Sequence, residues 1–349
     1  MKESFYSWGE YSFLFKQKAQ DFNVPPDIIL ELLKYSENLY SKKLPVIHDL
    51  KHLSYLTGFK DEYINRAIKG TGSFYRSFLI AKKNGNSRTI TEPLPGLKEI
   101  QYWILNNIIR RIEPNTLNNA YSVGRSIVTN AKYHTKQKMV LNIDIEKYFD
   151  NIKYSYIYDF FLELGYNKEV TEILSKLVSL NDGLPQGSPS SPYLSSILTK
   201  SIDIDLFAYC RDLNLRYSRY ADDITISGDF KAGKVILAVS DTLKKYGYTV
   251  NNKKTTIKLQ HQRQMVTGVV VNKRLSVKST SIRDIRQQVY YIEKFGLDKH
   301  LQKKREFKKN HLHHLLGKVN FYLSVRKTDK KLLELKVKLK SLIAKNQFL

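Results

Sequence analysis

The sequence predicts an α+β fold in which a sheet is backed by helices and followed by a separate helical lobe. Three strand-like segments, at 139–145, 215–226 and 266–277, alternate with segments whose apolar residues repeat at helical spacing. From Ser281 onward the pattern is helical, and the stretch "LLELKVKLKSLI" is amphipathic. A chain of 349 residues is long enough for two or three subdomains, so the helical lobe can have its own core.

The N-terminal part combines short helices with one hairpin. Residues 1–70 show helical apolar spacing in "DIILELLKY" and "LKHLSYL". Over 74–93, an apolar strand reaches the turn formers "NGN" at 84–86 and a Thr/Ile-rich strand returns, which predicts a β-hairpin. Five apolar residues at helical spacing then predict a helix over 97–112.

The middle of the chain holds a strand and a helix. In the strand predicted over 139–145, an apolar row occupies one face and Asp144 projects from the opposite face. A Gly/Pro/Ser loop follows at 184–192, and its Ser-Pro pair is a good cap and first turn for a helix over about 191–209.

Two further hairpins are predicted downstream. In 217–228, two strand-like arms flank Ala221 and Asp222, so the turn falls at these two residues. In 266–277, the turn is expected near Asn272-Lys273.

The charge balance predicts a nucleic-acid partner. The chain has 58 Lys and Arg against 33 Asp and Glu, a formal net charge of +25. The excess is concentrated in 251–349, which holds 25 basic and only 6 acidic residues. A basic surface that neutralises phosphates gains affinity for nucleic acid by releasing the counterions of those phosphates. This part of the chain is therefore expected to bind a polyanion. A merely soluble basic surface is the alternative.

The cysteine count and the hydropathy exclude several classes of protein. A single cysteine, Cys210, excludes an internal disulfide framework and a multi-cysteine zinc site. No apolar run is long enough to span a bilayer, and the first residues do not form a signal peptide. A cytoplasmic, reducing compartment with no membrane partner is therefore expected.

Three aspartates suggest a site for divalent metal ions. Asp222 and Asp223 are adjacent at a turn, where their charges repel unless a cation lies between them. Mg²⁺ is typically held by one or two carboxylates together with water and substrate phosphates. Two such ions, roughly 3.5–4 Å apart, can flank an in-line phosphoryl displacement. Asp144, 78 residues earlier, can join them only if the fold brings the strands together.

Together, three stretches resemble a known family. "NIDIEKYFDNI", "GLPQGSPSSP" and "YADD" resemble motifs A, B and C of reverse transcriptases, and the resemblance covers roughly residues 75–275. It implies a right-hand polymerase with N-terminal helices and fingers at 1–138 and a palm with an antiparallel sheet at 139–274. Residues of about 155–185 would contribute to the fingers, and 275–349 would form a basic helical thumb.

The resemblance also implies the catalytic residues. In that family the first aspartate of motif A and the paired aspartates of motif C bind the catalytic metals, which implies Asp144, Asp222 and Asp223 here. The backbone carbonyl of Ile145 would be a further ligand of the two Mg²⁺ ions. Lys254 resembles the family's motif D lysine, a proton donor to pyrophosphate, although Lys253 competes for that role and a lysine with no catalytic role is the favoured alternative.

Other motif positions imply a deoxynucleotide (dNTP) site. Phe149 corresponds to the ring that collides with a ribose 2′-OH, and Gln186 to a glutamine lining the nucleotide pocket. Arg88, and with it Lys82, would reach the triphosphate, because a guanidinium can clamp phosphate in two places. Tyr220 would brace the primer end. A core position for Phe149 and a solvated hairpin tip for the lysine are the alternatives.

Two short stretches resemble signatures of retron reverse transcriptases. "NAKYH" contains Asn130 and His134, and "VTG" contains Thr267 and Gly268, all of which would contact primer or RNA. A helix face with a satisfied histidine is the alternative for the first pair, whose spacing is i, i+4. The resemblance implies a structured non-coding RNA partner (msr-msd), priming from its internal 2′-OH, and a branched RNA–DNA product called msDNA. It also implies an effector protein and a role in anti-phage defence.

The basic tail fits a thumb that holds structured RNA through its phosphates. Lys303, Lys304 and Arg305 are its candidate RNA contacts, and its aromatic residues either stack on bases or pack in a core.

Three other functions remain open at this point. One is a reverse transcriptase of the group II intron or diversity-generating type. The second is a metal-dependent nuclease that uses the same carboxylates but has no need for Phe149 or Gln186. The third is a non-catalytic RNA-binding scaffold.

Overall fold

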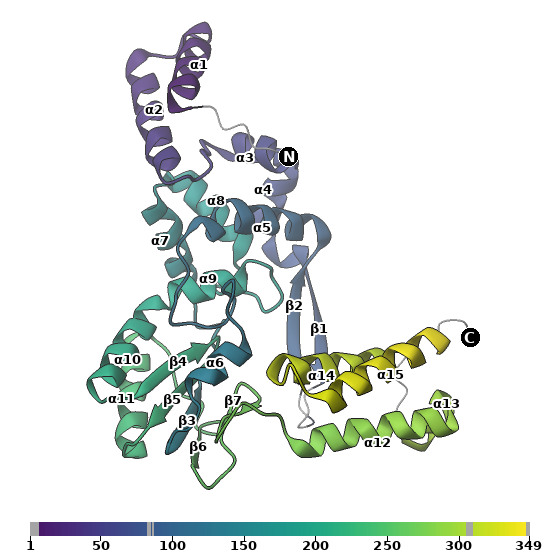
Figure 1. The fold of residues 1–349 in the computed structure, drawn as a ribbon. Coiled ribbons are helices and arrows are strands. Elements are labelled where there is room, and N and C mark those ends of the chain that lie inside the picture. The colour runs from purple at the N-terminus through teal and green to yellow at the C-terminus, as the bar shows by residue number, and fades with distance from the viewer. Residues whose placement is uncertain (1–6, 82–84, 86, 305–309, 347–349) are drawn as a thin grey trace. The chain divides into compact units, whose positions relative to one another are not determined.

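The computed structural model describes residues 7–81, 85, 87–304 and 310–346, and its chain divides into two compact units (Figure 1). The first unit comprises 1–116 and 147–201, and the second comprises 117–146 and 202–349. Each unit is therefore made from segments that are far apart in the sequence.

The first unit is mainly helical, as the apolar spacing of its N-terminal residues predicts. Side-chain caps define several helix starts: Ser7 and Glu10 form a capping box, and Asp49 accepts a hydrogen bond from the His52 amide. The helical elements are α1 (Trp8–Asp21), α2 (Pro26–Ser41), α3 (Leu50–Thr57), α4 (Asp61–Lys69), η1 (Thr71–Phe74), α5 (Pro95–Asn107), η2 (Ile109–Arg111), α7 (Tyr154–Leu164), α8 (Lys168–Val178) and α9 (Ser191–Leu198).

The hairpin predicted over 74–93 is confirmed. Strands β1 (Tyr75–Ala81) and β2 (Ser87–Pro93) pair antiparallel, and the last pair is Ala81 with Ser87. Gly85 has a φ of +84°, a conformation that glycine adopts without cost and that fits its place in the turn. Lys82 and Lys83 lie outside the described residues.

The helix predicted over 97–112 is shorter than expected. Helix α5 ends at Asn107, and the chain continues as the 3₁₀ turn η2. The helix ends where the backbone of Ile108 leaves helical geometry, with a φ of −115°. Ile104 and Ile108 are nevertheless fully buried, so the spacing correctly predicted which side chains face the core.

The helix predicted over about 191–209 is two helices. Helix α9 ends at Leu198, and α10 (Lys200–Asp212) begins after a break at Thr199. The Thr199 hydroxyl donates to the Ser195 carbonyl at 2.6 Å and lies 3.0 Å from the Tyr148 hydroxyl. Such side-chain bonds to backbone carbonyls compete with the helical ladder and bend helices.

The second unit contains a four-stranded sheet in the order β4-β5-β3-β6, and every neighbouring pair is antiparallel. Helix α6 packs against β4. Because β3 lies inside the sheet, Val140 is as fully buried as Leu141, so the strand has buried residues on both faces rather than the single apolar face predicted. The strands and accompanying helices are α6 (Ile127–Tyr133), β3 (Met139–Asp144), β4 (Arg216–Tyr220), β5 (Asp223–Gly228), α11 (Ala232–Lys245) and β6 (Thr256–Leu259).

The hairpin predicted over 266–277 is smaller and is not part of this sheet. Strands β7 (Met265–Val266) and β8 (Val269–Val270) form a separate pair, and the turn lies at Thr267-Gly268. Both turn residues have positive φ, 45° and 87°, as a two-residue type I′ turn requires. Asn272 lies outside this turn. Its side-chain amide donates to the carbonyls of Gln260 and Gln262.

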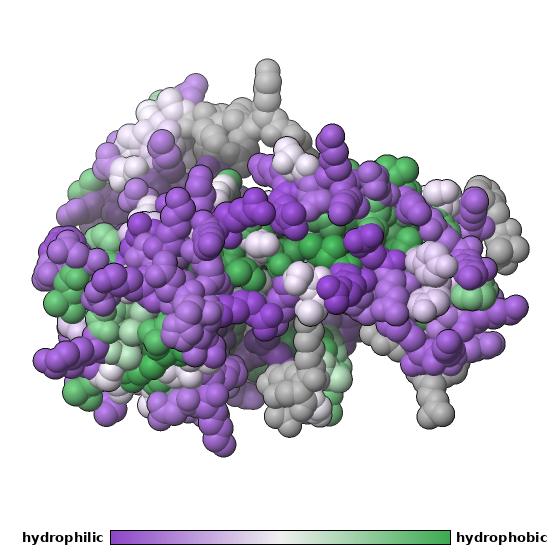
Figure 2. All heavy atoms as spheres, turned by 60° about the horizontal axis from the view of Figure 1, so that its bottom comes forward, coloured by the Kyte–Doolittle hydropathy of each residue, from purple (hydrophilic) through white to green (hydrophobic). Residues whose placement is uncertain are grey.

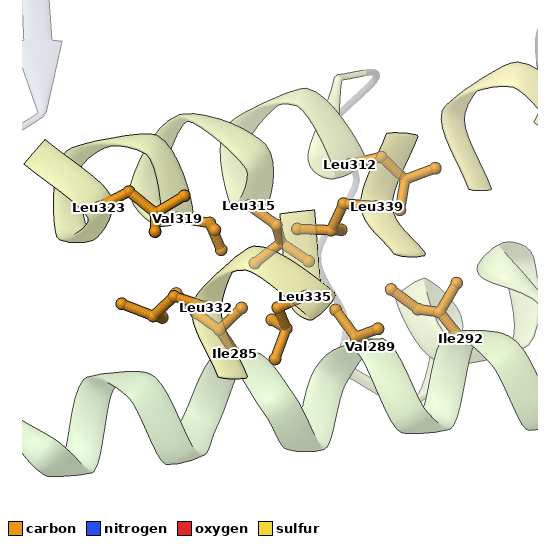
Figure 3. Close-up of a cluster of buried hydrophobic side chains, with 10 residues drawn as sticks. All are labelled: Ile285, Val289, Ile292, Leu312, Leu315, Val319, Leu323, Leu332, Leu335 and Leu339. Carbon is orange, nitrogen blue, oxygen red and sulfur yellow. The ribbon is translucent and has the colours of Figure 1, made fainter. Parts of the chain in front are cut away.

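The predicted C-terminal helical lobe is present and has its own core. Figure 3 shows ten buried apolar side chains that point toward one another between three of its helices. They include Val289 on the first helix, Leu315 on the third and Leu339 on the last. The helices are α12 (Ser279–Phe295), α13 (Leu297–Lys304), α14 (His311–Val325) and α15 (Lys330–Asn346).

Charged and polar residues dominate the outer surface that is in view in Figure 2, where hydrophobic residues appear as separate patches. This agrees with a chain in which 26% of residues are charged. None of the helices described is long and apolar enough to cross a membrane.

Candidate active site

The three aspartates singled out from the sequence come together at one end of the sheet. Asp144 ends β3 and is the direct cross-strand partner of Asp223, which begins β5. Asp222 occupies the β4–β5 turn, and its carbonyl accepts a hydrogen bond from the Ile145 amide at 2.9 Å. The predicted juxtaposition across 78 residues is therefore present in the fold.

A lysine contacts the Asp144 carboxylate. The Nζ atom of Lys254 lies 2.7 Å from both carboxylate oxygens, and the Asn251 amide donates to one of them at 3.1 Å. The Asp144 side chain is only 8% exposed, whereas that of Lys254 is 60% exposed. Of the two lysines proposed for the motif D role, Lys254 is thus the one with a contact at the acidic cluster.

The environment of the acidic cluster raises the pKa of Asp223. Loss of hydration on burial, and next the negative charges of Asp222 and Asp144, raise the pKa of Asp223 to about 6. The positive charge of Lys254 opposes the rise. Asp223 is exposed at its strand end, so solvent screens part of this repulsion. A bound cation would relieve the rest.

The residues fit a cation, although they are not a complete ligand shell. Among the residues that the structure describes, no three His, Cys, Asp or Glu side chains converge as a ready-made metal site. The Lys254 ammonium shows where a positive charge is accepted, between both oxygens of Asp144. Mg²⁺ sites commonly take one or two carboxylates from the protein and their other ligands from water and substrate phosphates.

A buried ion pair supports the turn that carries Asp222. Arg219 and Asp203 are both fully buried, and Arg219 donates to both carboxylate oxygens of Asp203. Arg219 also donates to the Ala221 carbonyl at 2.8 Å, and the Ala221 amide donates to Asn118 at 3.3 Å. Ala221 has a φ of +57°, which is uncommon for a residue with a side chain. These bonds hold the turn in a conformation it would otherwise avoid.

Sequence reasoning missed this support. The strand segment "RYSRY" shows an arginine in an alternating pattern, but nothing in it identifies a helical aspartate 16 residues earlier as the partner.

Two predicted nucleotide-site residues, Arg88 and Gln186, are joined within the first unit. The Arg88 Nε atom donates to the Gln186 side-chain oxygen at 2.8 Å, and the Gln186 carbonyl accepts from the Thr91 amide, also at 2.8 Å. Gly187 permits this close approach, since a Cβ there would lie 2.6 Å from the Thr91 carbonyl oxygen.

Phe149 is half-buried, and its neighbour Tyr148 takes the core position instead. The Tyr148 hydroxyl donates to the Ser195 carbonyl at 2.9 Å, and its ring meets that of Phe149 edge-on. The Leu184 amide donates to the Phe149 carbonyl at 3.4 Å, which ties Phe149 to the loop containing Gln186. The alternative of a fully buried core phenylalanine is therefore wrong.

The predicted nucleotide-site residues are divided between the two units. Phe149, Gln186 and Arg88 belong to the first unit, whereas the three aspartates and Tyr220 belong to the second. Tyr220 is half-buried at the end of β4.

Comparison with known proteins identifies the family. The profile of the family "Reverse transcriptase (RNA-dependent DNA polymerase)" matches residues 80–283. The retron Se72 reverse transcriptase of Salmonella heidelberg is 31% identical over 262 residues, which cover 72% of this chain and 69% of that protein. The retron Ec86 reverse transcriptase of Escherichia coli is 29% identical over 310 residues, 87% of this chain and 93% of that protein. The chain belongs to the retron reverse transcriptases.

It follows that the protein is an RNA-directed DNA polymerase, as the three motifs predict. The predicted right-hand polymerase class is confirmed, since helices are combined with an antiparallel sheet in a chain of this family. Among solved structures, a telomerase of Candida albicans in complex with a fragment of telomeric RNA aligns with a TM-score of 0.43 and 12% identity. That alignment covers 78% of this chain and 63%, just under two thirds, of the telomerase chain.

One signature of this retron reverse transcriptase is internal rather than RNA-facing. Asn130 and His134 on α6 are fully buried. The His134 ring nitrogens lie 2.7 Å from the hydroxyls of Ser218 and Ser227, and the Ser218 hydroxyl donates to Asn130 at 2.6 Å. The predicted direct contact of these two side chains with RNA does not fit the structure, because both are fully buried and their hydrogen bonds join α6 to β4 and β5. The satisfied histidine, weighed as the alternative, is what the structure contains.

The "VTG" signature of the reverse transcriptase packs on the same helix. The Thr267 hydroxyl donates to the Ile127 carbonyl at the start of α6, and Val266 shares a buried apolar cluster with Ala131. Gly268 is exposed. The two signatures, whose last residues His134 and Gly268 are 134 positions apart, thus form one structural unit.

The predicted RNA contacts in the C-terminal lobe are open to solvent. Lys303 and Lys304 are exposed on α13, and Arg305 lies outside the described residues.

Stability should depend on pH through His134. Burial, and secondarily the charge of Arg216, lowers the pKa of His134 from 6.5 to about 3. The unfolded chain binds this proton near pH 6.5 and the folded chain does not, so the stabilisation is complete above pH 6.5 and is lost as the pH falls toward 3. Denaturant unfolding should show a slope of up to about 1.4 kcal/mol per pH unit from this residue.

His134→Gln should remove that part of the slope, whereas His261→Gln, at an exposed position, should keep it. Equal slopes in the wild type and the His134 variant would contradict the assignment.

Arg219→Met should destabilise the protein by about 3–5 kcal/mol, because it leaves the Asp203 carboxylate buried without its cation. The matched control is Arg211→Met, which breaks an exposed pair with Asp212 and should cost at most about 1 kcal/mol. Free energies of unfolding from denaturant titration test both changes. If the two variants lose equal stability, the buried pair does not support the fold as described.

Proposed function

We propose that this reverse transcriptase copies a structured non-coding RNA of its own retron (msr-msd) into msDNA, primed from a 2′-OH of that RNA. The observation that carries the catalytic part is the meeting of Asp144 with Asp222 and Asp223 at one end of the sheet. The retron relatives support the choice of template and product. A group II intron-like or diversity-generating enzyme has no comparable support.

The acidic cluster is the proposed metal site. Asp144, Asp222 and Asp223, with the backbone carbonyl of Ile145, would hold two Mg²⁺ ions. Such ions, when bound, activate an attacking hydroxyl and stabilise the leaving oxygens. The β4–β5 turn keeps the two neighbouring carboxylates close despite their repulsion. A cation bound between them would offset that repulsion. Lys254 would donate a proton to the departing pyrophosphate.

The nucleotide would be held by residues of the first unit. Arg88 has its Nε engaged by Gln186, which orients the guanidinium, and its remaining N–H groups can donate to phosphate oxygens. Lys82 would assist on the same hairpin. The half-buried Phe149 ring would exclude a ribose 2′-OH by collision, and Tyr220 would brace the primer end. A nuclease would need none of this nucleotide site.

For the domain organisation we propose fingers with N-terminal helices at 1–138, a palm at 139–274 and a thumb at 275–349, with residues of about 155–185 contributing to the fingers. The proposed palm takes parts of both compact units, because the first unit includes 147–201.

The wider biology rests on the retron resemblance. We propose an effector protein as a partner, a role in anti-phage defence and a cytoplasmic location. RNA contacts are proposed for Lys303, Lys304 and Arg305, and for the exposed Thr267-Gly268 turn. Asn130 and His134 would act by holding α6, and with it this turn, in place.

Asp222→Asn should abolish DNA synthesis, with a loss on the order of 10³-fold or more, because a metal ligand is removed. RNA binding should be unchanged, since the phosphate-binding lysines are untouched. The measurements are dNTP incorporation and RNA affinity, with Asp241→Asn, an exposed aspartate on α11, as the control.

Sequencing the nucleic acid that co-purifies with the wild-type protein from its host completes this test. We expect a branched RNA–DNA to co-purify with the wild-type protein and to be absent from the Asp222→Asn variant. Linear RNA alone would contradict the retron product, and synthesis by the Asp222 variant would contradict the catalytic assignment.

Phe149→Ala should admit ribonucleotides. Removing the ring removes the collision with the 2′-OH, so discrimination between dNTP and rNTP should fall by on the order of 10²-fold. Steady-state incorporation of each nucleotide measures this ratio. Phe149→Tyr keeps the ring and should keep the discrimination, and an unchanged ratio in the alanine variant would show that another residue excludes the hydroxyl.

A further inference from the structure

The C-terminal lobe contains a pocket between α12 and α13 that has no assigned role. Its volume is about 590 Å³, within the roughly 300–1,000 Å³ range of small-ligand pockets. It is lined by Asp284, Gln287, Gln288, Tyr291, Phe295, Lys299, His300, Lys303 and Lys304. Aromatic, cationic and hydrogen-bonding groups thus share one cavity.

Two aromatic rings form one wall of the pocket. Tyr291 and Phe295 lie one turn apart on α12, with ring centroids 6.1 Å apart and planes inclined by only 25°. They are 37% and 50% exposed and are not members of the buried cluster, to which α12 contributes Ile285, Val289 and Ile292 from its other face. Core packing therefore does not explain these rings, whereas half-exposed aromatic faces are what nucleobases stack on.

Helix α13 contributes lysines to the lining. Lys299, Lys303 and Lys304 line the pocket from α13, and the Lys303 ammonium lies 6.0 Å from the Tyr291 ring centroid. The one carboxylate in the lining, Asp284, accepts a hydrogen bond from the Gln288 amide at 2.8 Å. Three cations against one carboxylate favour an anionic ligand, and cations beside an aromatic wall match the phosphate and base of one nucleotide.

We propose that this pocket binds an unpaired nucleotide of the RNA partner, with the base stacked on Tyr291 and Phe295 and the phosphate held by Lys299, Lys303 and Lys304. The RNA identity rests on the proposed function. A paired nucleotide does not fit the proposal, because its base faces are covered within the duplex and only the lysines could reach it. The side chains of Gln287 and Asp284 offer hydrogen-bonding groups to the edge of the base.

The test uses the full-length protein and an unstructured RNA octamer with one 2-aminopurine, whose fluorescence is quenched by stacking. Tyr291→Ala and Phe295→Ala should each weaken binding by about 5- to 150-fold and reduce the quenching. Tyr291→Phe keeps the ring and should bind within about two-fold of wild type. The control is Tyr55→Ala, which removes an 84% exposed tyrosine on α3 outside the pocket lining and should leave affinity unchanged.

Two further probes separate the sources of binding. A fully paired RNA duplex should lack the dependence on Tyr291, whereas a DNA octamer of the same sequence should keep it, because the stacking and phosphate contacts do not involve the 2′-OH. The proposal is overturned if only lysine substitutions weaken the octamer, if Tyr55→Ala has the same effect as Tyr291→Ala, or if the duplex shows the same dependence. Incorporation of dNTPs on a simple primed template should persist in Tyr291→Ala, so loss of pocket binding and failure of the polymerase function are distinguishable.

Discussion

The ion pair between Arg219 and Asp203 is the interaction on which the geometry of the acidic cluster depends. The turn after Arg219 combines two unfavourable features, an alanine with positive φ and two adjacent carboxylates that repel. Arg219 offsets the first by donating to the Ala221 carbonyl, and its own charge is neutralised by Asp203 in a region without solvent. The turn is thus fixed from the interior, and the exposed side remains open for ligands.

Charge is arranged very differently inside the sheet and in the C-terminal lobe. At the sheet, a few charges are paired at close range, as in Lys254 with Asp144, and their positions are set by backbone pairing. In the C-terminal lobe, exposed lysines act together, and such charges are screened by salt beyond about 10 Å. Salt should therefore weaken the electrostatics of the second arrangement more than the close contact of Lys254 with Asp144.

The sequence predicted local structure well wherever a motif and its partner lie close together. The β4–β5 turn at Ala221-Asp222 is where the alternating arms predict it. The sequence does not predict the edge strand β6, whose four residues alternate polar and apolar but form only a short run with all four exposed. The preference of asparagine for turns predicts a turn near Asn272, but here its side chain donates to carbonyls of another loop.

Long-range partners could not be read in the same way. Asn130 and His134 share a helix face, which the spacing shows, but their partners come from strands more than 80 residues away. The bond between Arg88 and Gln186, at a separation of 98 residues, is likewise a product of the fold. For Asn130 and His134 the missing information was burial, since the same residue types on a surface would face solvent. For the exposed Arg88 it was the tertiary placement of Gln186 beside β2.

The contact between Gly187 and β2 links two parts of the proposed nucleotide site. The loop carrying Gln186 lies so close to Thr91 that no side chain fits between them, and backbone and side-chain hydrogen bonds join the loop to the strand. A displacement of the hairpin would drag the loop along. The positions of Arg88 and Gln186 are therefore coupled, so a ligand that displaces one of them displaces the other.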